Sequence, residues 1–207
     1  MSNEKKPYIV GLTGGIASGK TAATDYLQSL GAIVVDADVE SRAVTAEGGE
    51  ALPVIRETFG DGVFHEDGTL DRAALGAMVF ADIAKRRMLE KIVHPMVQRR
   101  TLQAIREAGQ RGESIVFLSV PLLYESGMDA LCDETWVFYV DGETQLRRLM
   151  ARDNLSAEEA RRRIDSQMPA DERAARAQIV IRTGRPIEQT RAEIRSVCRD
   201  LKRRIPV

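Results

Sequence analysis

The stretch GLTGGIASGKT, residues 11–21, follows a short apolar run and precedes a helical pattern. Its last eight residues match G-x-x-x-x-G-K-[ST], in which glycines let backbone amides turn inward around a phosphate group. Lys20 would reach the β- and γ-phosphates, and the Thr21 hydroxyl would bind Mg²⁺. The stretch therefore predicts a phosphate-binding loop, or P-loop. The expected nucleotide-binding residues are Gly14, Gly15, Ile16, Ala17, Ser18, Gly19, Lys20, Thr21 and Ala22.

Short apolar runs predict a parallel α/β sheet around this loop. The expected strands are Tyr8–Leu12, Ala32–Val35, Ile115–Val120, Glu134–Val140 and Ile179–Arg182. The 36–115 stretch is far longer than one crossover helix needs and has helical patterns, so an insertion is expected there. The expected helices are Lys20–Leu30, Glu50–Phe59, Asp71–Phe80, Ile83–Ala108, Glu143–Arg152, Ser156 to near Pro169, and one from Pro186. Pro95 is expected to kink or divide the fourth of these.

Composition limits the class of partner. Thirty basic residues balance 31 acidic ones, and aromatic content is 5%, which argues against sequence-independent binding of nucleic acid. The arginine doublets at 86–87 and 99–100 are expected to belong to helix faces of mixed charge. The two cysteines lack metal-site spacing, and neither a signal peptide nor a membrane span is apparent, so we expect a soluble cytoplasmic protein.

A P-loop alone does not identify a kinase, because GTPases and motor ATPases share it. The sequence has neither the N-K-x-D nor the D-x-x-G pattern expected of a GTPase. Asp141 could serve as the magnesium-organising acid of a motor, but it also reads as the cap of the helix from Glu143, which we favour. Ser156 and Glu159 have capping-box spacing.

Two carboxylates end the second expected strand. Asp36 is expected at the carboxyl edge of the strand beside the P-loop strand, where open parallel sheets bind ligands. Asp38 follows two residues later, with Arg42 one helical turn beyond. One of the two carboxylates could be a helix cap. Position alone does not decide whether Asp36 has a functional role. A functional carboxylate here could accept a proton from an attacking hydroxyl.

Over nearly its whole length the sequence resembles the dephospho-coenzyme A kinase family. The segments that carry the resemblance are GLTGGIASGKT, VVDADVESR, DGTLDRAALGAMVF, LEKIVHP, VPLLYESG and RRRIDSQMP. The resemblance implies a kinase that phosphorylates the ribose 3′-hydroxyl of dephospho-coenzyme A with ATP and Mg²⁺, without a nucleic-acid or membrane partner. It implies one P-loop kinase domain, 1–207, with a helical acceptor-binding insertion at 39–95 and an arginine-rich helical lid at 143–175. The rivals are a kinase of another small acceptor, such as a nucleoside monophosphate or a sugar acid, and a nucleotide-hydrolysing switch or motor.

The resemblance also implies roles for individual residues. The expected catalytic residues are Asp36 as general base, Lys20, Arg148 and Arg152. The expected acceptor-binding residues are Asp38, Arg42, His94, Leu122, Leu123, Tyr124, Glu125 and Arg163, the last also in the lid. Two departures stand out. Ala17 stands where the family usually has a glycine, and we expect this change to be tolerated. Gln178, Arg182 and Thr183 replace the polar residues that are usual in a segment expected near the adenine. The preference for ATP over GTP is therefore left open.

Overall fold

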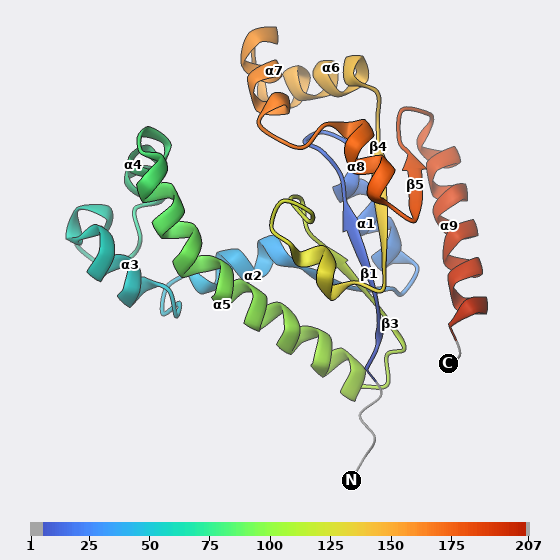
Figure 1. Ribbon diagram of the computed structural model, residues 1–207, viewed down its shortest axis with the longest axis horizontal. Coiled ribbons are helices and arrows are strands. Elements are labelled where there is room, and N and C mark those ends of the chain that lie inside the picture. Colours follow the sequence, from blue (N-terminus) through green and yellow to red (C-terminus); the bar gives the residue numbers. More distant parts are fainter. Residues whose placement is uncertain (1–5, 206–207) are drawn as a thin grey trace. The chain divides into compact units, whose positions relative to one another are not determined.

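The structure, a computed structural model, describes residues 6–205. Within them, five parallel strands form one sheet in the order β2-β3-β1-β4-β5. Figure 1 labels β1, β3, β4 and β5 of this sheet. The strands are β1 (Tyr8–Thr13), β2 (Ile33–Asp36), β3 (Ile115–Ser119), β4 (Glu134–Tyr139) and β5 (Ile179–Arg182). The predicted α/β class and all five predicted strands are confirmed.

Helices connect the strands. They are α1 (Lys20–Ser29), α2 (Ala37–Val44), α3 (Leu52–Phe59), α4 (Arg72–Ala81), α5 (Ile83–Gln110), α6 (Gly142–Asp153), α7 (Ala157–Asp165), α8 (Ala170–Arg176) and α9 (Ile187–Arg204), with short 3₁₀ turns η1 (Asp61–Val63) and η2 (Met128–Leu131). The expected helix cap at Asp36 or Asp38 is confirmed by the start of α2, although no range was given for that helix, and α8 was not predicted. No helix of the described residues is both long and apolar enough to cross a membrane.

The strand order corrects one expectation about Asp36. β2 was expected beside β1, but β3 lies between them. The register aligns Tyr8 with Ile115 and Leu12 with Ser119 across the β1–β3 pair. β3 enters the sheet only after the long 36–115 stretch. Local sequence patterns cannot predict its place in the strand order, since the crossover connections decide that order. On this side of β1 the neighbouring strand therefore ends in Ser119, not in Asp36.

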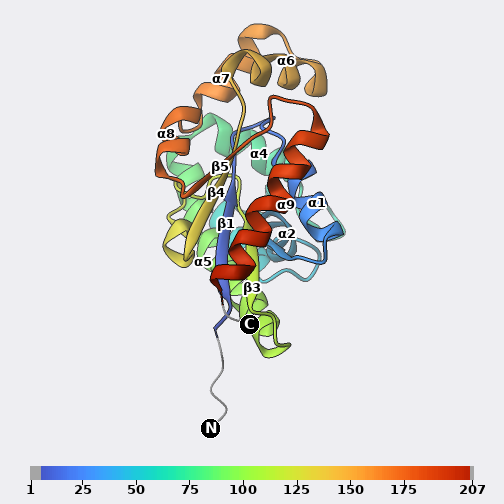
Figure 2. The ribbon, with the colours of Figure 1, turned by 90° about the vertical axis from the view of Figure 1, so that its right-hand side faces the viewer.

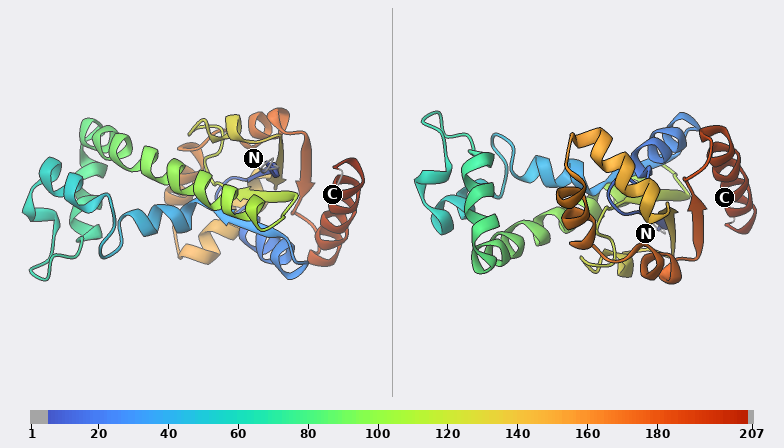
Figure 3. Two further views of the ribbon diagram at one scale, coloured as in Figure 1. Left: turned by 90° about the horizontal axis from the view of Figure 1, so that it is seen from below. Right: turned by 90° about the horizontal axis from the view of Figure 1, so that it is seen from above.

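Alternate residues of β1 face opposite sides of the sheet. On one side Val10 and Leu12 belong to the main apolar core, which includes Leu27 of α1 and Ile194 of α9. Figures 2 and 3 show α1 and α9 together beside the sheet. On the other side Gly11 has no room for a side chain, because an added Cβ would lie 2.7 Å from the Cys132 sulfur. The sheet is thus covered closely on both faces, as parallel sheets are.

Side chains cap the N-termini of α6 and α7, the helices of the arginine-rich segment, as predicted. The Asp141 carboxylate accepts a hydrogen bond from the Thr144 amide and caps α6, and this bond lowers its pKa. Ser156 and Glu159 form a complete capping box at the start of α7. α7 ends at Asp165, earlier than the expected stop near Pro169.

The chain divides into two compact units. Within the described residues, unit 1 contains residues 6–35 and 105–205, and unit 2 contains residues 36–104. The division between the units falls inside α5, which continues from Ile83 through Pro95 to Gln110. Of the two alternatives expected for Pro95, a kink or a division of the helix, the division is therefore wrong. Proline removes one helical hydrogen bond at a cost of about 3 kcal/mol, and tertiary contacts offset that cost. Val97, two residues beyond, is buried.

Unit 2 is helical, with a small core and ion pairs at its surface. Val44, Ile55 and Val63 are fully buried. Arg100 pairs with Glu40 at 2.7 Å and Arg99 with Glu50 at 2.8 Å, and Arg86 pairs with Glu90 at 3.0 Å. The predicted mixed-charge faces for the arginine doublets are confirmed for these three residues.

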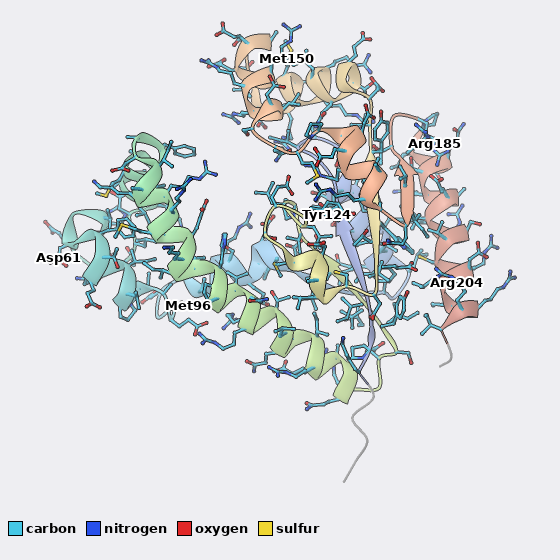
Figure 4. The ribbon with its side chains drawn as sticks, viewed as in Figure 1. Asp61, Met96, Tyr124, Met150, Arg185 and Arg204 are labelled. Atoms are coloured by element: carbon cyan, nitrogen blue, oxygen red, sulfur yellow. The ribbon has the colours of Figure 1, made fainter. Side chains whose placement is uncertain are left out.

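A buried carboxylate holds the end of α9 in unit 1. Glu134, at the start of β4, is 5% exposed. It accepts hydrogen bonds from Arg204, labelled in Figure 4, and from the Trp136 indole at 2.6 Å. Arg204 uses two nitrogens, at 3.0 and 3.0 Å from the same oxygen. A buried charge needs such partners, because its desolvation is costly.

Glu134→Ala is predicted to lower the free energy of unfolding by about 2–3 kcal/mol, because it leaves a cavity and a buried indole N–H without its acceptor. Denaturant unfolding measures the change. Glu188→Ala is the matched control: its carboxylate is 71% exposed and pairs with Arg191 on the same helix, so a loss of at most about 0.5 kcal/mol is expected. Equal losses for the two variants would contradict the assigned role of Glu134.

Candidate active site

The P-loop leaves β1 and enters α1 through two left-handed residues. Ala17 has φ 58° and Gly19 has φ 87°, and the Ser18 amide bonds the Gly15 carbonyl at 3.0 Å. Gly14 must be glycine, because an added Cβ would lie 2.4 Å from the Ser18 hydroxyl oxygen. Among the described residues no side chain caps α1, so the first-turn amides remain able to bind an anion.

Lys20 lies at the start of α1 and contacts the neighbouring strand. Its Nζ donates a hydrogen bond to Ser119 Oγ at 2.6 Å. Ser119 is buried at the carboxyl end of β3, so the ammonium is held at the edge of the sheet from which the P-loop emerges. No local sequence pattern selects this serine, because its position beside β1 depends on the strand order.

The end of β5 supports the P-loop. Thr183 Oγ1 donates to the Ser18 carbonyl at 2.5 Å, and the Thr183 carbonyl accepts from Arg148 at 2.7 Å. Arg148, an expected catalytic residue, therefore lies at the same sheet edge as the P-loop. Thr183, which was singled out only as a departure from the family pattern, is a direct P-loop contact.

Gln178 lies just before β5, at the end of the strand opposite Thr183. Its Oε1 accepts from the Thr135 amide at 2.7 Å, at the start of β4. A four-residue strand separates it from Thr183, and each strand residue advances about 3.3 Å. Arg182 is nearer the P-loop edge, with its guanidinium 5.4 Å from the centre of the Tyr139 ring.

Two predicted lid arginines share one carboxylate. Arg152 of α6 bonds Asp153 at 2.7 Å, and Arg163 of α7 bonds the same carboxylate at 3.1 Å. The hydrogen bond from Arg152 holds the pKa of Asp153 below its usual range. All three side chains reach solvent, so this cluster links α6 to α7 without fixing either arginine deep in the protein.

The segment after β3 contains four expected acceptor residues. Leu123 is fully buried, with a methyl group 2.9 Å from where a Gly11 Cβ would stand, so it packs in the core. Leu122 is 43% exposed. The Tyr124 hydroxyl, whose residue is labelled in Figure 4, bonds Thr135 Oγ1 at 2.8 Å, and burial raises its pKa.

Glu125 completes this segment. It accepts from the Arg173 guanidinium at 3.1 Å and from the Met168 amide at 3.1 Å. Arg173 is 1% exposed, so this carboxylate balances a buried positive charge. Glu125 thus has a clear internal partner in addition to the acceptor-binding role expected for it.

The candidates of unit 2 lie on α2 and α5. Asp36 is the N-cap of α2, and its Oδ1 accepts from the Asp38 amide at 2.8 Å. A carboxylate has two oxygens, so a cap and a second role are compatible. Asp38, Arg42 and His94 all have exposed side chains on this unit.

Comparison with known proteins decides the family. The profile of the family described as dephospho-CoA kinase matches residues 8–188. The chain belongs to this family. A dephospho-CoA kinase from Symbiobacterium thermophilum is 46% identical over 191 residues, which cover 92% of this chain and 80% of the relative. A dephospho-CoA kinase structure from Campylobacter jejuni has a TM-score of 0.73 at 27% identity and covers 94% of this chain and 97% of that one.

A Thermus thermophilus crystal structure is also similar, with a TM-score of 0.81 at 35% identity over 96% of this chain and 100% of that one. Membership in the dephospho-CoA kinase family makes the chain an ATP-dependent kinase. The predicted enzyme class and P-loop kinase fold are confirmed. A switch or motor without a small acceptor is excluded by the same match.

Ala17 departs from the family pattern at a backbone position that favours glycine. A left-handed conformation costs a residue with a Cβ about 1–2 kcal/mol, partly offset by the larger entropy that glycine loses on folding. Ala17→Gly is therefore predicted to raise the free energy of unfolding by about 0.5–1 kcal/mol. Ala192→Gly, in the right-handed helix α9, is the control and should lower it by about 1 kcal/mol. If denaturant unfolding shows that both variants are less stable than the unchanged chain, the claim that Ala17 is strained is contradicted.

Proposed function

We propose that the chain transfers the γ-phosphoryl group of ATP to the 3′-hydroxyl of dephospho-coenzyme A, which gives coenzyme A and ADP in the last step of coenzyme A biosynthesis. The observation that carries the proposal is the P-loop between β1 and α1, with its uncapped helix start, in a chain whose family match spans residues 8–188. The proposed site of action is the cytoplasm, where ATP is supplied.

The phosphates of ATP are proposed to bind at the P-loop amides and Lys20. Ser119 supports this role, because the 2.6 Å contact keeps the lysine ammonium at the sheet edge through a partner that carries no charge. Mg²⁺ fits the exposed Thr21 hydroxyl in the first turn of α1. The described residues contain no cluster of three or more acids, histidines or cysteines that could hold a metal, and Mg²⁺ in kinases uses few protein ligands and keeps waters and phosphate oxygens. The ion would neutralise charge that develops on the phosphates.

The acceptor is proposed to bind at Arg42 and His94 of the insertion 39–95 and at Asp38, just before it. Leu122 and Tyr124, after β3, are the proposed apolar contacts. The exposure of the three polar side chains supports a role in binding. Glu125 would act from its position beside Arg173. Leu123 is left out of this set because it is buried.

Asp36 is the proposed general base. The ribose hydroxyl oxygen attacks the γ-phosphorus, its proton passes to the Asp36 carboxylate, and the bond from the γ-phosphorus to the bridging oxygen breaks as ADP leaves. The end of β2 supports this assignment, because the carboxyl ends of parallel strands share one edge of a sheet. Asp38 is assigned to acceptor binding.

Residues 143–175 are the proposed lid. Arg148, Arg152 and Arg163 would neutralise the transferring phosphoryl group, since guanidinium is always charged and forms paired hydrogen bonds with oxyanions. The shared contact of Arg152 and Arg163 with Asp153 supports a coordinated response of α6 and α7.

An acceptor screen with ATP and Mg²⁺, with products identified by mass, tests the function. Dephospho-coenzyme A should gain one phosphoryl group and release one ADP, whereas nucleoside monophosphates and sugar acids should remain unchanged. Phosphorylation of one of those acceptors instead would contradict the proposal. ADP release without any acceptor would do so as well.

Asp36→Asn is predicted to lower turnover by about a hundred- to ten-thousand-fold, because asparagine keeps the shape and cannot take the proton. Affinity for ATP should change little. Asp38→Asn is the matched variant and should act mainly on the KM for the acceptor. A large turnover loss in Asp38→Asn alone would show that the two roles are reversed.

Hydrogen exchange in α6 and α7 is predicted to slow when ATP and the acceptor are both bound, because lid closure removes backbone amides from solvent. α9 serves as the internal reference, since it packs on the sheet core. Unchanged exchange in α6 and α7 would indicate a rigid surface and contradict the lid.

A further inference from the structure

Two glutamine side chains hold one residue of the P-loop. Gln145 of α6 donates its Nε2 hydrogen to the Ile16 carbonyl at 2.8 Å. Gln167, just after α7, accepts from the Ile16 amide with its Oε1 at 2.8 Å. Gln145 is only 4% exposed. Both backbone polar groups of Ile16 are therefore hydrogen-bonded to side chains from the proposed lid region. We call Gln145 and Gln167 together the glutamine clamp.

The clamp explains a glycine that the P-loop motif does not require. Gly15 stands at an unrestricted position of G-x-x-x-x-G-K-[ST]. A Cβ there would lie 2.8 Å from Gln145 Nε2 and 3.1 Å from an Arg173 guanidinium nitrogen. Both distances are shorter than ordinary contacts, so a side chain at position 15 would displace the clamp. Arg173 is itself held by Glu125 at 3.1 Å.

The residue after Ile16 is the strained one. Ala17 has a left-handed backbone with φ 58°, a conformation that persists only where the surroundings fix it. The residue before Ala17 is held by the hydrogen bonds to both backbone groups of Ile16. The residue after it is held by the hydrogen bond from Thr183 to the Ser18 carbonyl. The turn that directs the P-loop amides inward is thus held from outside the loop.

We propose that Gln145 and Gln167 are positioning residues that hold the P-loop in its phosphate-binding conformation. Because Gln145 is near the start of α6 and Gln167 follows α7, the clamp also anchors both ends of the proposed lid to the phosphate site. Its loss weakens nucleotide binding more than it weakens acceptor binding or the fold. This inference deepens the proposed function, and nucleotide binding tests it without any acceptor.

The test uses Gln145→Met and Gln167→Met, which keep the approximate side-chain length and remove the amide. Titration calorimetry with ADP and Mg²⁺ should give a dissociation constant about tenfold higher for each variant, the effect of losing about one hydrogen bond. Gln189→Met, on the exposed side of α9, is the control and should bind as the unchanged chain does. Gly15→Ala should weaken binding as the methionine variants do.

A second measurement separates positioning from simple stability. Exchange of the Ile16 amide, followed by NMR in the nucleotide-free protein, should accelerate at least tenfold in Gln167→Met. Gln167→Glu keeps an acceptor oxygen and should restore the protection. An unchanged dissociation constant, even with a lower melting temperature, would overturn the proposal. So would unchanged Ile16 exchange. Failure of the acceptor screen would refute the proposed acceptor and leave these two results unaffected.

Discussion

Two left-handed residues, Ala17 and Gly19, turn the chain between β1 and α1 and direct the intervening amides toward a phosphate. The rest of unit 1 is arranged around this turn. Thr183 at the end of β5 holds the Ser18 carbonyl, Ser119 at the end of β3 holds Lys20, and Phe138 of β4 closes against Gly14. Three different strands therefore contact one loop, and the parallel order of the sheet is what brings their carboxyl ends to it.

The same arrangement determines which basic side chains have neutral partners and which are paired with carboxylates. Phosphoryl transfer depends mainly on positioning and on neutralising charge, and it requires little covalent chemistry from the protein. Lys20 bonds a neutral hydroxyl and Arg148 bonds a neutral carbonyl, so both keep their charge available. Arg152 and Arg163 instead share Asp153. Arg173 is buried and paired with Glu125, which suits a support behind the P-loop better than contact with a mobile phosphate.

The sequence predicted much of this and missed what depends on three-dimensional neighbours. The P-loop, the five strands and the caps at Asp141 and Ser156 follow from local patterns, because each depends on residues within a few positions of one another. Ser119 could not be selected, since its contact with Lys20 exists only because β3 lies between β1 and β2. The burial of Leu123, an expected acceptor-binding residue, could not be predicted, because it arises where the chain after β3 folds back against Gly11. Gln145 and Gln167 are joined to Ile16 only by the tertiary fold.

The central claim is that the phosphate-binding turn is already formed and held before nucleotide binds. Backbone ¹⁵N order parameters of Ile16, Ala17 and Gly19 in the nucleotide-free protein test it most directly. The account predicts values near those of a rigid backbone, about 0.85, for all three. Values below about 0.6, rising only when nucleotide is added, would mean that the ligand forms the turn and would contradict the account.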